Sequence, residues 1–401
     1  MNITINPAPL SGSIKAIPSK SAAHRLLICA ALAERETCIA CPSLSKDIEA
    51  TARCLEALGA GIEYYDGQYR VRPIEKVQNN ATLDCGESGS TLRFLLPVVC
   101  ALGGGARIKM HGRLPQRPLS PLWEELCAHG AKLSRPEEDI IAVSGRLEAG
   151  SYSIRADISS QFISGLLFAL PVLDGASRLT LEGNIESKGY IDMSRQAQQE
   201  FKLDIPFDGR VFEIPAEASY TSPGNADVEG DWSNAAFWLA ADVLSGGTLQ
   251  LSGLREDSLQ GDKAVVELIQ RIRAGNAVID VKDVPDLVPI LSVVAAVSPG
   301  VTQFVNGARL RIKESDRISS VCRMLRSLGA QCEEQAEGLT VTGGRLLGGT
   351  VDGENDHRIV MSAAVAAIAC EKPVSILGAQ AADKSYPTFF EDYKKLGGKL
   401  Q

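Results

Sequence analysis

The sequence predicts a two-domain protein of the α/β class, with helices and strands mixed as in α+β folds. Its 401 residues exceed the roughly 250–300 residues that a single hydrophobic core usually supports. An amphipathic helix followed by a short strand recurs six times along the chain, and each repeat also contains a second helix that is apolar on almost every side. We therefore expect two domains of three repeats each, with helices packed on small sheets.

The amphipathic helices share a polar face and a single apolar stripe. In one copy, apolar residues recur at three- and four-residue steps from Ile318 to Leu328, and Gly329 then supplies a left-handed C-terminal cap. We expect each helix of this kind to pack one face on a sheet. The six copies begin at Lys46, Ser120, Gly189, Gly261, Glu314 and Ser385.

The helices of the second kind open with a small or polar residue and are then almost wholly apolar, which is typical of buried helices. A polar first residue is an ordinary N-cap, and for any one helix that interpretation is favoured. A helix N-terminus can also bind an anion, and six similar helix starts favour a shared anion-binding site in a cleft. The six helices begin at Ser21, Ser88, Ser159, Asp231, Asp286 and Asp356.

The domain boundary is expected after the third repeat, near residues 228–234. The predicted domains are residues 20–228 and residues 1–19 together with 229–401, because the N-terminal strand contains no helix of its own and can close the second half. The active site is expected in the cleft between these domains.

Composition indicates a cytoplasmic protein without an extended nucleic-acid surface. A formal net charge of −8 argues against nucleic-acid binding, which needs many Lys and Arg on one face. No apolar run reaches the roughly 18–20 residues of a membrane span, and the first ten residues lack the features of a signal peptide. Most of the ten cysteines lie in apolar helical patterns, as expected in a reducing compartment, and Cys38 and Cys41 form a single CxxC that is weak evidence for a metal site.

Candidate anion-binding residues in the first half lie at two helix starts. PSKSAAHR places Lys20 at a helix start and Arg25 four residues after Ser21. The Lys20 ammonium and the planar Arg25 guanidinium can then both reach a phosphate. GESGSTLR offers backbone amides around Gly89, where no side chain obstructs a ligand, and Arg93 follows one turn later. The next loop adds Arg113 and Arg117, for which simple solvation is the favoured alternative.

The second half carries a matching set of charges. Lys313, Arg317, Arg358 and Lys384 can neutralise a multiply charged substrate, and Glu314 beside them is a candidate proton-transfer group. Pairing of these residues on an exposed helix surface is an equally good interpretation of KESDR taken alone.

Asp286 is a second candidate acid or base, at the start of a buried helix after Val284 and Pro285. An ordinary N-cap is the strong alternative for this carboxylate. His357, within NDHR, is expected to orient a neighbouring group.

Ten short motifs span essentially the whole chain. They read, in order, PSKSAAHR, GESGSTLR, RPLSPL, SSQF, ESKGYID, EGDWSNAAF, VPDLVP, KESDR, NDHR and DKSYP. Each is short, but their order is highly specific, and it resembles that of the 5-enolpyruvylshikimate-3-phosphate synthase family of 3-phosphoshikimate 1-carboxyvinyltransferases. The resemblance implies an inside-out α/β barrel of two domains, each with three βαβαββ units in pseudo-threefold arrangement.

The resemblance also implies the site residues. Asp286, Glu314 and Lys20 would be catalytic. The residues implied to contact shikimate 3-phosphate are Lys20, Ser21, Arg25, Ser159, Ser160, Gln161, Ser187, Tyr190, Asp286 and Lys313. Those implied to hold phosphoenolpyruvate are Lys20, Gly89, Arg117, Gln161, Arg317, Arg358 and Lys384.

The implied reaction moves an enolpyruvyl group to the 5-hydroxyl of shikimate 3-phosphate and releases phosphate, within the shikimate pathway to aromatic amino acids. It needs no metal, no cofactor, no nucleic acid and no membrane, and a monomer is expected. Asp286 would assist deprotonation of the hydroxyl and Glu314 would handle the methylene proton, with Lys20 sharing either task.

The chain departs from the family pattern in three places. Residues 87–94 read ESGSTLRF where N-A-G-T-A-M-R-P is common, and Arg309 stands where an Asn is common. The stretch from Ala274 to Val284 is short, which predicts a smaller sheet between the fourth and fifth repeats.

Three alternatives remain open at this point. The related UDP-N-acetylglucosamine enolpyruvyl transferases have a Lys-Asn pair and a reactive loop Cys, whereas this chain has SKSAAHR and no Cys between Gly112 and Pro121. A non-catalytic sensor of phosphorylated metabolites would not need the candidate acid and base residues. A ligase-like enzyme acting on RNA ends would need a more basic surface and a nucleophilic His.

Overall fold

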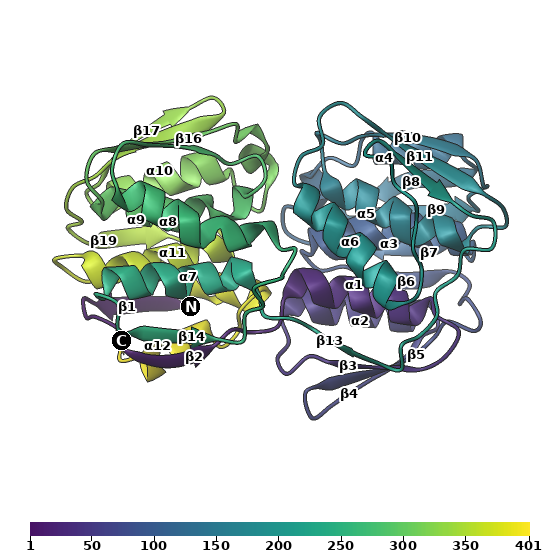
Figure 1. Cartoon of the computed structure of the whole chain (residues 1–401), viewed down its shortest axis with the longest axis horizontal. Helices are drawn as coiled ribbons and strands as arrows, with labels where there is room; N and C mark the ends of the chain where they lie inside the picture. The colour runs from purple at the N-terminus through teal and green to yellow at the C-terminus, as the bar shows by residue number, and fades with distance from the viewer. The chain divides into compact units, whose positions relative to one another are not determined.

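The computed structural model describes all 401 residues and divides into two compact units (Figure 1). The N-terminal unit is Pro18–Val228, and the C-terminal unit combines Met1–Ile17 with Glu229–Gln401. Each unit mixes helices with three small sheets, so the predicted α/β class is confirmed. No helix in the structure is both long enough and apolar enough to cross a membrane.

The three sheets of the N-terminal unit share one pattern, in which the first two strands are parallel and the later neighbours antiparallel. In spatial order they are β13 (Asn225–Asp227), β3 (Thr37–Ala40), β5 (Gln68–Arg72) and β4 (Gly61–Tyr65); β6 (Ala81–Asp84), β7 (Ala106–Lys109), β9 (Ile140–Gly145) and β8 (Ala131–Glu137); and β10 (Ser151–Arg155), β11 (Ser177–Glu182) and β12 (Val211–Ile214).

The sheets of the C-terminal unit follow the same rule. In spatial order they are β19 (Gly349–Asp352), β20 (Val374–Leu377), β1 (Asn2–Asn6) and β21 (Lys399–Leu400); β15 (Ala277–Asp280), β16 (Val301–Val305), β18 (Gly338–Thr342) and β17 (Gln331–Gln335); and β14 (Leu249–Ser252) with β2 (Gly12–Lys15). The last sheet has only two strands, which confirms the smaller sheet predicted between the fourth and fifth repeats.

Both ends of the chain belong to one sheet. Strand β1 pairs antiparallel with β20, from Asn2 opposite Leu377, and with β21, where Ile5 lies opposite Leu400. The backbones of Thr4 and Gln401 also exchange two hydrogen bonds.

The two predicted kinds of helix are present in both units. The buried kind comprises α1 (Lys20–Ala31), α3 (Gly89–Leu102), α5 (Ser160–Ala169), α7 (Trp232–Leu244), α9 (Val288–Val297) and α11 (His357–Ala366). The amphipathic kind comprises α2 (Lys46–Leu58), α4 (Leu122–Ala128), α6 (Lys188–Glu200), α8 (Val265–Arg273), α10 (Arg317–Ser327) and α12 (Phe389–Lys395). Short 3-10 turns are η1 (Leu114–Gln116), η2 (Leu170–Val172), η3 (Gly261–Ala264), η4 (Pro285–Leu287), η5 (Ala308–Ile312), η6 (Ala367–Ala369) and η7 (Ala379–Lys384).

The predicted apolar stripe of α10 is confirmed. Ile318, Val321 and Leu325 are fully buried, and Gly329 adopts a φ of +88° just beyond the helix, where its N–H donates to the carbonyl of Arg326. A side chain at such a φ is strained, so glycine suits this helix end.

Most of the predicted polar helix starts are N-caps. Ser88, Ser159, Asp231 and Asp356 accept hydrogen bonds from backbone N–H groups of their own helices. Helix α1 starts one residue earlier than expected and is capped by Ser19. The N-cap interpretation of Asp286 is wrong, because this residue lies in η4 and its side chain does not cap α9.

The buried helices of each unit pack against one another, as α7, α9 and α11 do in the C-terminal unit (Figure 1). In the N-terminal unit, α3 and α5 approach closely at Gly165. A Cβ atom there would lie 2.3 Å from the carbonyl oxygen of Arg93 and 3.0 Å from Cγ of Pro97. The close approach therefore requires glycine.

The Gly165→Ala variant is expected to separate α3 from α5, because a backbone carbonyl cannot move aside as a flexible side chain can. Overpacking of this kind destabilises by about 1–3 kcal/mol. Urea unfolding measures the change. The control is Gly344→Ala, since a Cβ there meets nothing within 4 Å, and equal stability of both variants would contradict the prediction.

Candidate active site

Lys20 is the first residue of α1, and its ammonium forms an ion pair of 2.8 Å with Asp47 in the first turn of α2. The two side chains are 18% and 15% exposed. The pair is therefore sheltered but still open to an incoming anion. Asp47 was not identified from the sequence.

Arg25 is buried one turn further along α1. Its guanidinium donates to the carbonyls of Ser21 and Tyr190, at 2.6 and 2.8 Å, and to the hydroxyl of Ser194 at 2.9 Å. It also lies 5.0 Å from the ring centre of Phe94. Burial lowers the pKa of Arg25 to about 10, although Tyr190 opposes the shift, so this residue remains a cation at neutral pH.

A second group of polar residues surrounds the start of α3. Gln161 donates to the Ser90 hydroxyl at 2.9 Å and accepts from Arg93 at 3.2 Å. A Cβ atom on Gly89 would lie 2.6 Å from the Arg117 guanidinium and 2.7 Å from that of Arg93. The bare backbone of Gly89 thus lies against two cations beside a helix N-terminus, an arrangement suited to anions.

The remaining predicted residues of this unit lie at the starts of two further helices. Ser159 caps α5, and Ser160 is its buried first residue. Ser187 precedes α6 with a left-handed φ of +53°, and Tyr190 follows in the first turn of that helix. The ring of Tyr190 lies 6.0 Å from the Arg25 guanidinium, which links these residues to α1.

A buried hydrogen-bond chain joins the starts of α1, α2 and α3. His24 Nδ1 lies 2.7 Å from the Thr51 hydroxyl, which lies 2.7 Å from that of Thr91, and Thr91 donates to Ser88 at 2.7 Å. The single proton of each hydroxyl then requires His24 to donate through Nδ1. Burial, with Lys20 and Arg25 nearby, lowers the pKa of His24, which favours this neutral tautomer. The sequence shows a histidine within an apolar helix, but it does not show which distant residues this histidine contacts.

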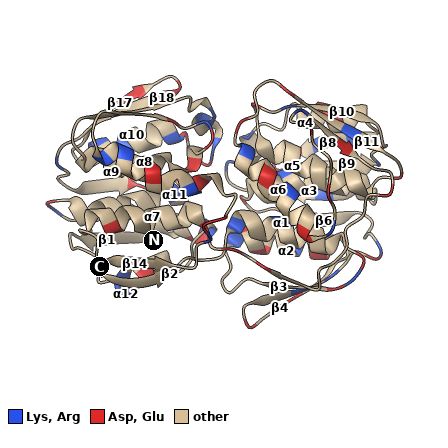
Figure 2. Cartoon of the chain, in the orientation of Figure 1, with Lys and Arg blue, Asp and Glu red and all other residues tan.

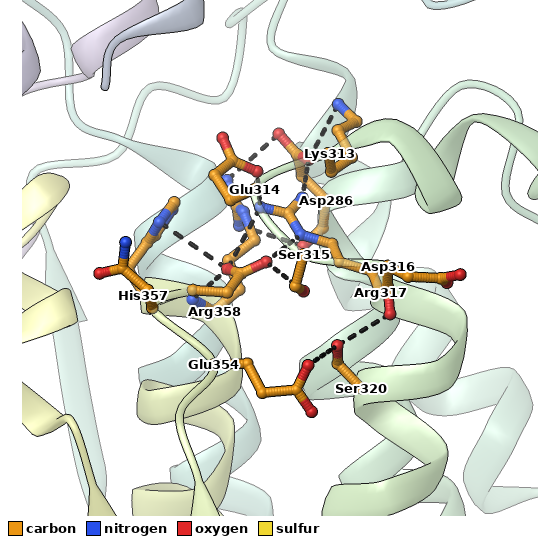
Figure 3. Close-up of polar contacts among 12 residues, drawn as sticks. Asp286, Lys313, Glu314, Ser315, Asp316, Arg317, Ser320, Glu354, His357 and Arg358 are labelled. Atoms are coloured by element: carbon orange, nitrogen blue, oxygen red, sulfur yellow. Dashed lines mark hydrogen bonds and ion pairs between the residues drawn. The ribbon is translucent and has the colours of Figure 1, made fainter. Parts of the chain in front are cut away.

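In the C-terminal unit, Arg317 is the centre of a group of charges that we call the Asp286 cluster (Figure 3). Arg317 is 1% exposed and donates to Asp286 at 2.6 Å, to Glu314 at 2.6 Å and to Asp356 at 2.8 Å. The Asp286 cluster consists of Asp286, Lys313, Glu314, Arg317, Asp356 and Arg358.

Asp286 accepts from all three cations of this cluster. Besides Arg317, Lys313 lies 3.4 Å away and Arg358 lies 3.2 Å away. Arg358 also donates to the Asp286 carbonyl at 3.0 Å and to the Ser233 hydroxyl at 2.7 Å. Burial lowers the pKa of the Lys313 ammonium; Asp286 opposes that shift, and Arg317 adds to it.

Asp356 has two functions that the sequence did not reveal together. It caps α11 through the Arg358 N–H at 2.9 Å, and it accepts from Arg317 and from the Ser315 hydroxyl at 3.0 Å. Burial opposes ionisation of Asp356, but the charges of Arg317 and His357 and the hydrogen bond from Arg317 together outweigh it, so the pKa of this carboxyl is lowered. Ionised Asp356 thereby holds the Arg317 side chain in place.

Other predicted residues lie near this group. Lys384 is largely buried and donates to the Asn355 carbonyl at 2.6 Å, beside the start of α11. His357 lies 3.9 Å from Asp356. Arg309 donates to the Lys282 carbonyl at 2.7 Å. The structure contains no group of three or more His, Cys, Asp or Glu side chains arranged to hold a metal ion.

Both units thus place cations at helix starts, and several of these cations are paired with carboxylates. Acidic and basic residues are interspersed over both units (Figure 2). An arriving phosphate or carboxylate can replace an internal carboxylate as the partner of a cation, since charge-assisted bonds to Arg and Lys suit both anions. The released carboxylate can then accept a proton.

Comparison with known proteins places the chain in one family. The model of the EPSP synthase family, described as 3-phosphoshikimate 1-carboxyvinyltransferase, matches residues 5–393. The 3-phosphoshikimate 1-carboxyvinyltransferases of Clostridium acetobutylicum and Clostridium perfringens are 40% and 39% identical to it, over 99% and 100% of this chain and 98% and 99% of theirs. The chain therefore belongs to the EPSP synthase family.

Solved structures agree on the fold. EPSP synthase from Acinetobacter baumannii matches with a TM-score of 0.81, covering 100% of this chain and 99% of that one. A second structure from the same organism gives a TM-score of 0.82. The sequence identities are 22% and 21%, so this likeness concerns the fold alone.

The Arg317→Ala variant is expected to lose about 3–5 kcal/mol of stability, because three buried or half-buried carboxylates would lose their shared cation. Urea unfolding at neutral pH measures the loss. Arg271→Ala is the control: Arg271 is 49% exposed and 4.0 Å from Glu267, so its removal should change stability by no more than about 0.5 kcal/mol. Similar losses in both variants would contradict the assignment.

Proposed function

We propose that this chain transfers the enolpyruvyl group of phosphoenolpyruvate to the 5-hydroxyl of shikimate 3-phosphate, releasing phosphate and forming 5-enolpyruvylshikimate 3-phosphate. The observation that carries the proposal is the family match over residues 5–393. Family membership makes the chain a transferase of the shikimate pathway, which supplies aromatic amino acids. The rival reaction on UDP-N-acetylglucosamine is not favoured, since the relatives are named for the shikimate reaction.

We propose that both units contribute to binding shikimate 3-phosphate. Arg25 supports this role because it stays charged in a buried setting between α1 and α6. The helix starts of α1, α5 and α6 offer N–H groups to the phosphate and hydroxyl groups. The proposed residues are Lys20, Ser21, Arg25, Ser159, Ser160, Gln161, Ser187, Tyr190, Asp286 and Lys313.

For phosphoenolpyruvate, we propose the cations that lie near Gly89 and in the Asp286 cluster. The unobstructed backbone of Gly89 beside Arg117 supports this choice, as does the position of Arg358 at the start of α11. Arg317 would act mainly as the fixed charge behind the site, because it is almost fully buried. The proposed residues are Lys20, Gly89, Arg117, Gln161, Arg317, Arg358 and Lys384.

The proposed chemistry is an addition followed by an elimination. The methylene carbon of phosphoenolpyruvate gains a proton, and the 5-hydroxyl oxygen attacks the adjacent carbon and loses its own proton. The tetrahedral intermediate then expels phosphate as the new methyl group gives up a proton. We assign the hydroxyl proton to Asp286 and the methylene proton to Glu314, while Lys20 can assist either transfer.

The pairing within the Asp286 cluster suggests how these carboxylates become reactive. The hydrogen bonds from Arg317 and Arg358 stabilise the charge of the Asp286 carboxylate, which makes it a weak base. When Arg358 and Lys313 turn to substrate anions, Asp286 loses bonds that stabilise its charge. Its affinity for a proton rises at the moment the hydroxyl arrives.

We further propose that the protein acts in the cytoplasm as a monomer. The ten cysteines are free thiols, as expected in a reducing compartment. Each unit encloses its own hydrophobic core, so neither requires a second chain to cover its sheets.

Phosphate release tests the function directly. The purified protein is mixed with phosphoenolpyruvate and either shikimate 3-phosphate or UDP-N-acetylglucosamine, without added metal. We expect release only with the shikimate acceptor. Release only with the nucleotide sugar would assign the chain to the sister reaction, and binding of both phosphorylated ligands without turnover would favour a sensor.

The Gly89→Ala variant is expected to raise the KM for phosphoenolpyruvate more than it lowers kcat. The new methyl group would displace the flexible ends of Arg93 and Arg117 without disturbing backbone. Steady-state kinetics with each substrate varied in turn measures the effect. Gly344→Ala is again the control, and a raised KM confined to shikimate 3-phosphate would contradict the assignment.

The Asp286→Asn variant is expected to lower kcat by about 10²–10⁴-fold, the range for losing a general base. Asn keeps the shape of the side chain but cannot accept the hydroxyl proton. Asp257→Asn is the matched control, because Asp257 is 72% exposed and pairs only with Arg255. A kcat within about twofold of the wild type would remove Asp286 from the mechanism.

A further inference from the structure

Asp262 lies in η3, a turn that is held against the start of α7 and the segment before η4. The side chain of the preceding Gln260 accepts from the Trp232 N–H at 3.0 Å and donates to the Gly230 carbonyl at 2.8 Å. A Cβ on Gly261 would lie 3.2 Å from the Asp283 carbonyl. These contacts hold η3 against the start of α7, where Ser233 contacts Arg358, and against the segment before η4.

The Asp262 carboxylate is buried without an ion pair, and the Ser233 hydroxyl is its one hydrogen-bonding neighbour. Asp262 is 2% exposed, and its contact with Ser233 falls short of ideal hydrogen-bond geometry at both carboxylate oxygens. Buried carboxylates are normally paired or hydrogen-bonded, because desolvation strongly disfavours the charge. A buried carboxylate with one imperfect hydrogen bond and no ion pair therefore calls for a functional explanation.

The charged groups that face Asp262 belong to the proposed active site. Burial raises the pKa of Asp262 to about 6, the Asp286 carboxylate adds to the shift, and the Arg358 guanidinium opposes it. The Ser233 hydroxyl accepts from Arg358 at 2.7 Å and donates to Asp262, which also opposes the shift. Asp231, the N-cap of α7, adds to the shift.

We propose that Asp262 is a positioning residue that acts on the reaction through Asp286 and Arg358. Its negative charge, placed behind the site, repels the Asp286 carboxylate and attracts the Arg358 guanidinium. Since electrostatic coupling between two groups is mutual, ionised Asp262 increases the proton affinity of Asp286 and so strengthens it as a base. The inference rests on the roles proposed above for Asp286 and Arg358.

This charge destabilises the fold. The native pKa of Asp262 lies above its unfolded value, so between these two values the native state binds the extra proton. Stability consequently falls as the pH rises through this range, and the full loss is present above about pH 6. A residue of purely structural value would not behave in this way, because its replacement would weaken the protein.

The test compares Asp262→Asn with the wild type and with the exposed control Asp257→Asn. Thermal unfolding without substrates is measured at about pH 5 and about pH 8, where Asp262 is mainly protonated and mainly ionised. We expect Asp262→Asn to melt at a higher temperature than the wild type near pH 8, with the difference shrinking near pH 5. The control should follow the wild type at both values.

Kinetics provides the second measurement. In the wild type we expect kcat to rise as the pH increases through about 6, as Asp262 ionises. In Asp262→Asn this rise should disappear and kcat near pH 8 should fall about tenfold, the effect of roughly one unit of lost basicity at Asp286. In Ser233→Ala the rise should move to higher pH, because one of the groups that favour the ionised form is gone.

The outcomes separate this inference from the proposed function. Lower thermal stability of Asp262→Asn near pH 8, or an unchanged pH profile in both Asp262→Asn and Ser233→Ala, would overturn the role of Asp262 alone. A wild-type protein that releases no phosphate from its substrates would overturn the proposed function, and with it the kinetic role of Asp262. The thermal measurement would still report whether Asp262 is a destabilising buried charge.

Discussion

The need to keep positive charge in place before any anion is bound dominates this structure. A buried arginine without a partner would strongly destabilise the fold. Arg317 instead forms ion pairs with Asp286, Glu314 and Asp356. Two of the carboxylates that neutralise it, Asp286 and Glu314, are also the candidate proton carriers. One set of ion pairs therefore both neutralises a buried cation and holds two candidate proton-transfer groups in place.

The repeated architecture brings such groups together. All six sheets begin with a parallel strand pair, and a buried helix starts after the first strand of a pair in case after case, as with α3 between β6 and β7. Helix starts are where backbone N–H groups lack partners, so each repeat provides a place for an anion or for a capping side chain. Ser88 and Asp356 satisfy their own helices and also bind neighbouring groups, which links the caps to the polar clusters.

Features that depend on neighbouring residues could be predicted from the sequence. The stripe and glycine cap of α10, and the caps Ser88 and Ser159, follow from spacing and residue type alone. Contacts between distant residues could not be predicted, since nothing local connects His24 to Thr51 or Ser315 to Asp356. Asp286 shows the limit most clearly. Its position before a helix favoured a cap, but three cations from other segments determine where its carboxylate lies.

The sheet that joins the two ends of the chain has a consequence for synthesis on the ribosome. Strand β1 is made before the N-terminal unit, whereas its partners β20 and β21 are made after it. The residues of the N-terminal unit are complete at Val228, whereas the partner β20 begins only at Val374, which at ordinary translation rates is on the order of 7–30 s later. The N-terminal unit can therefore fold during translation. The pairing of β1 must follow completion of the N-terminal unit, and until then β1 has to be kept from pairing with other strands.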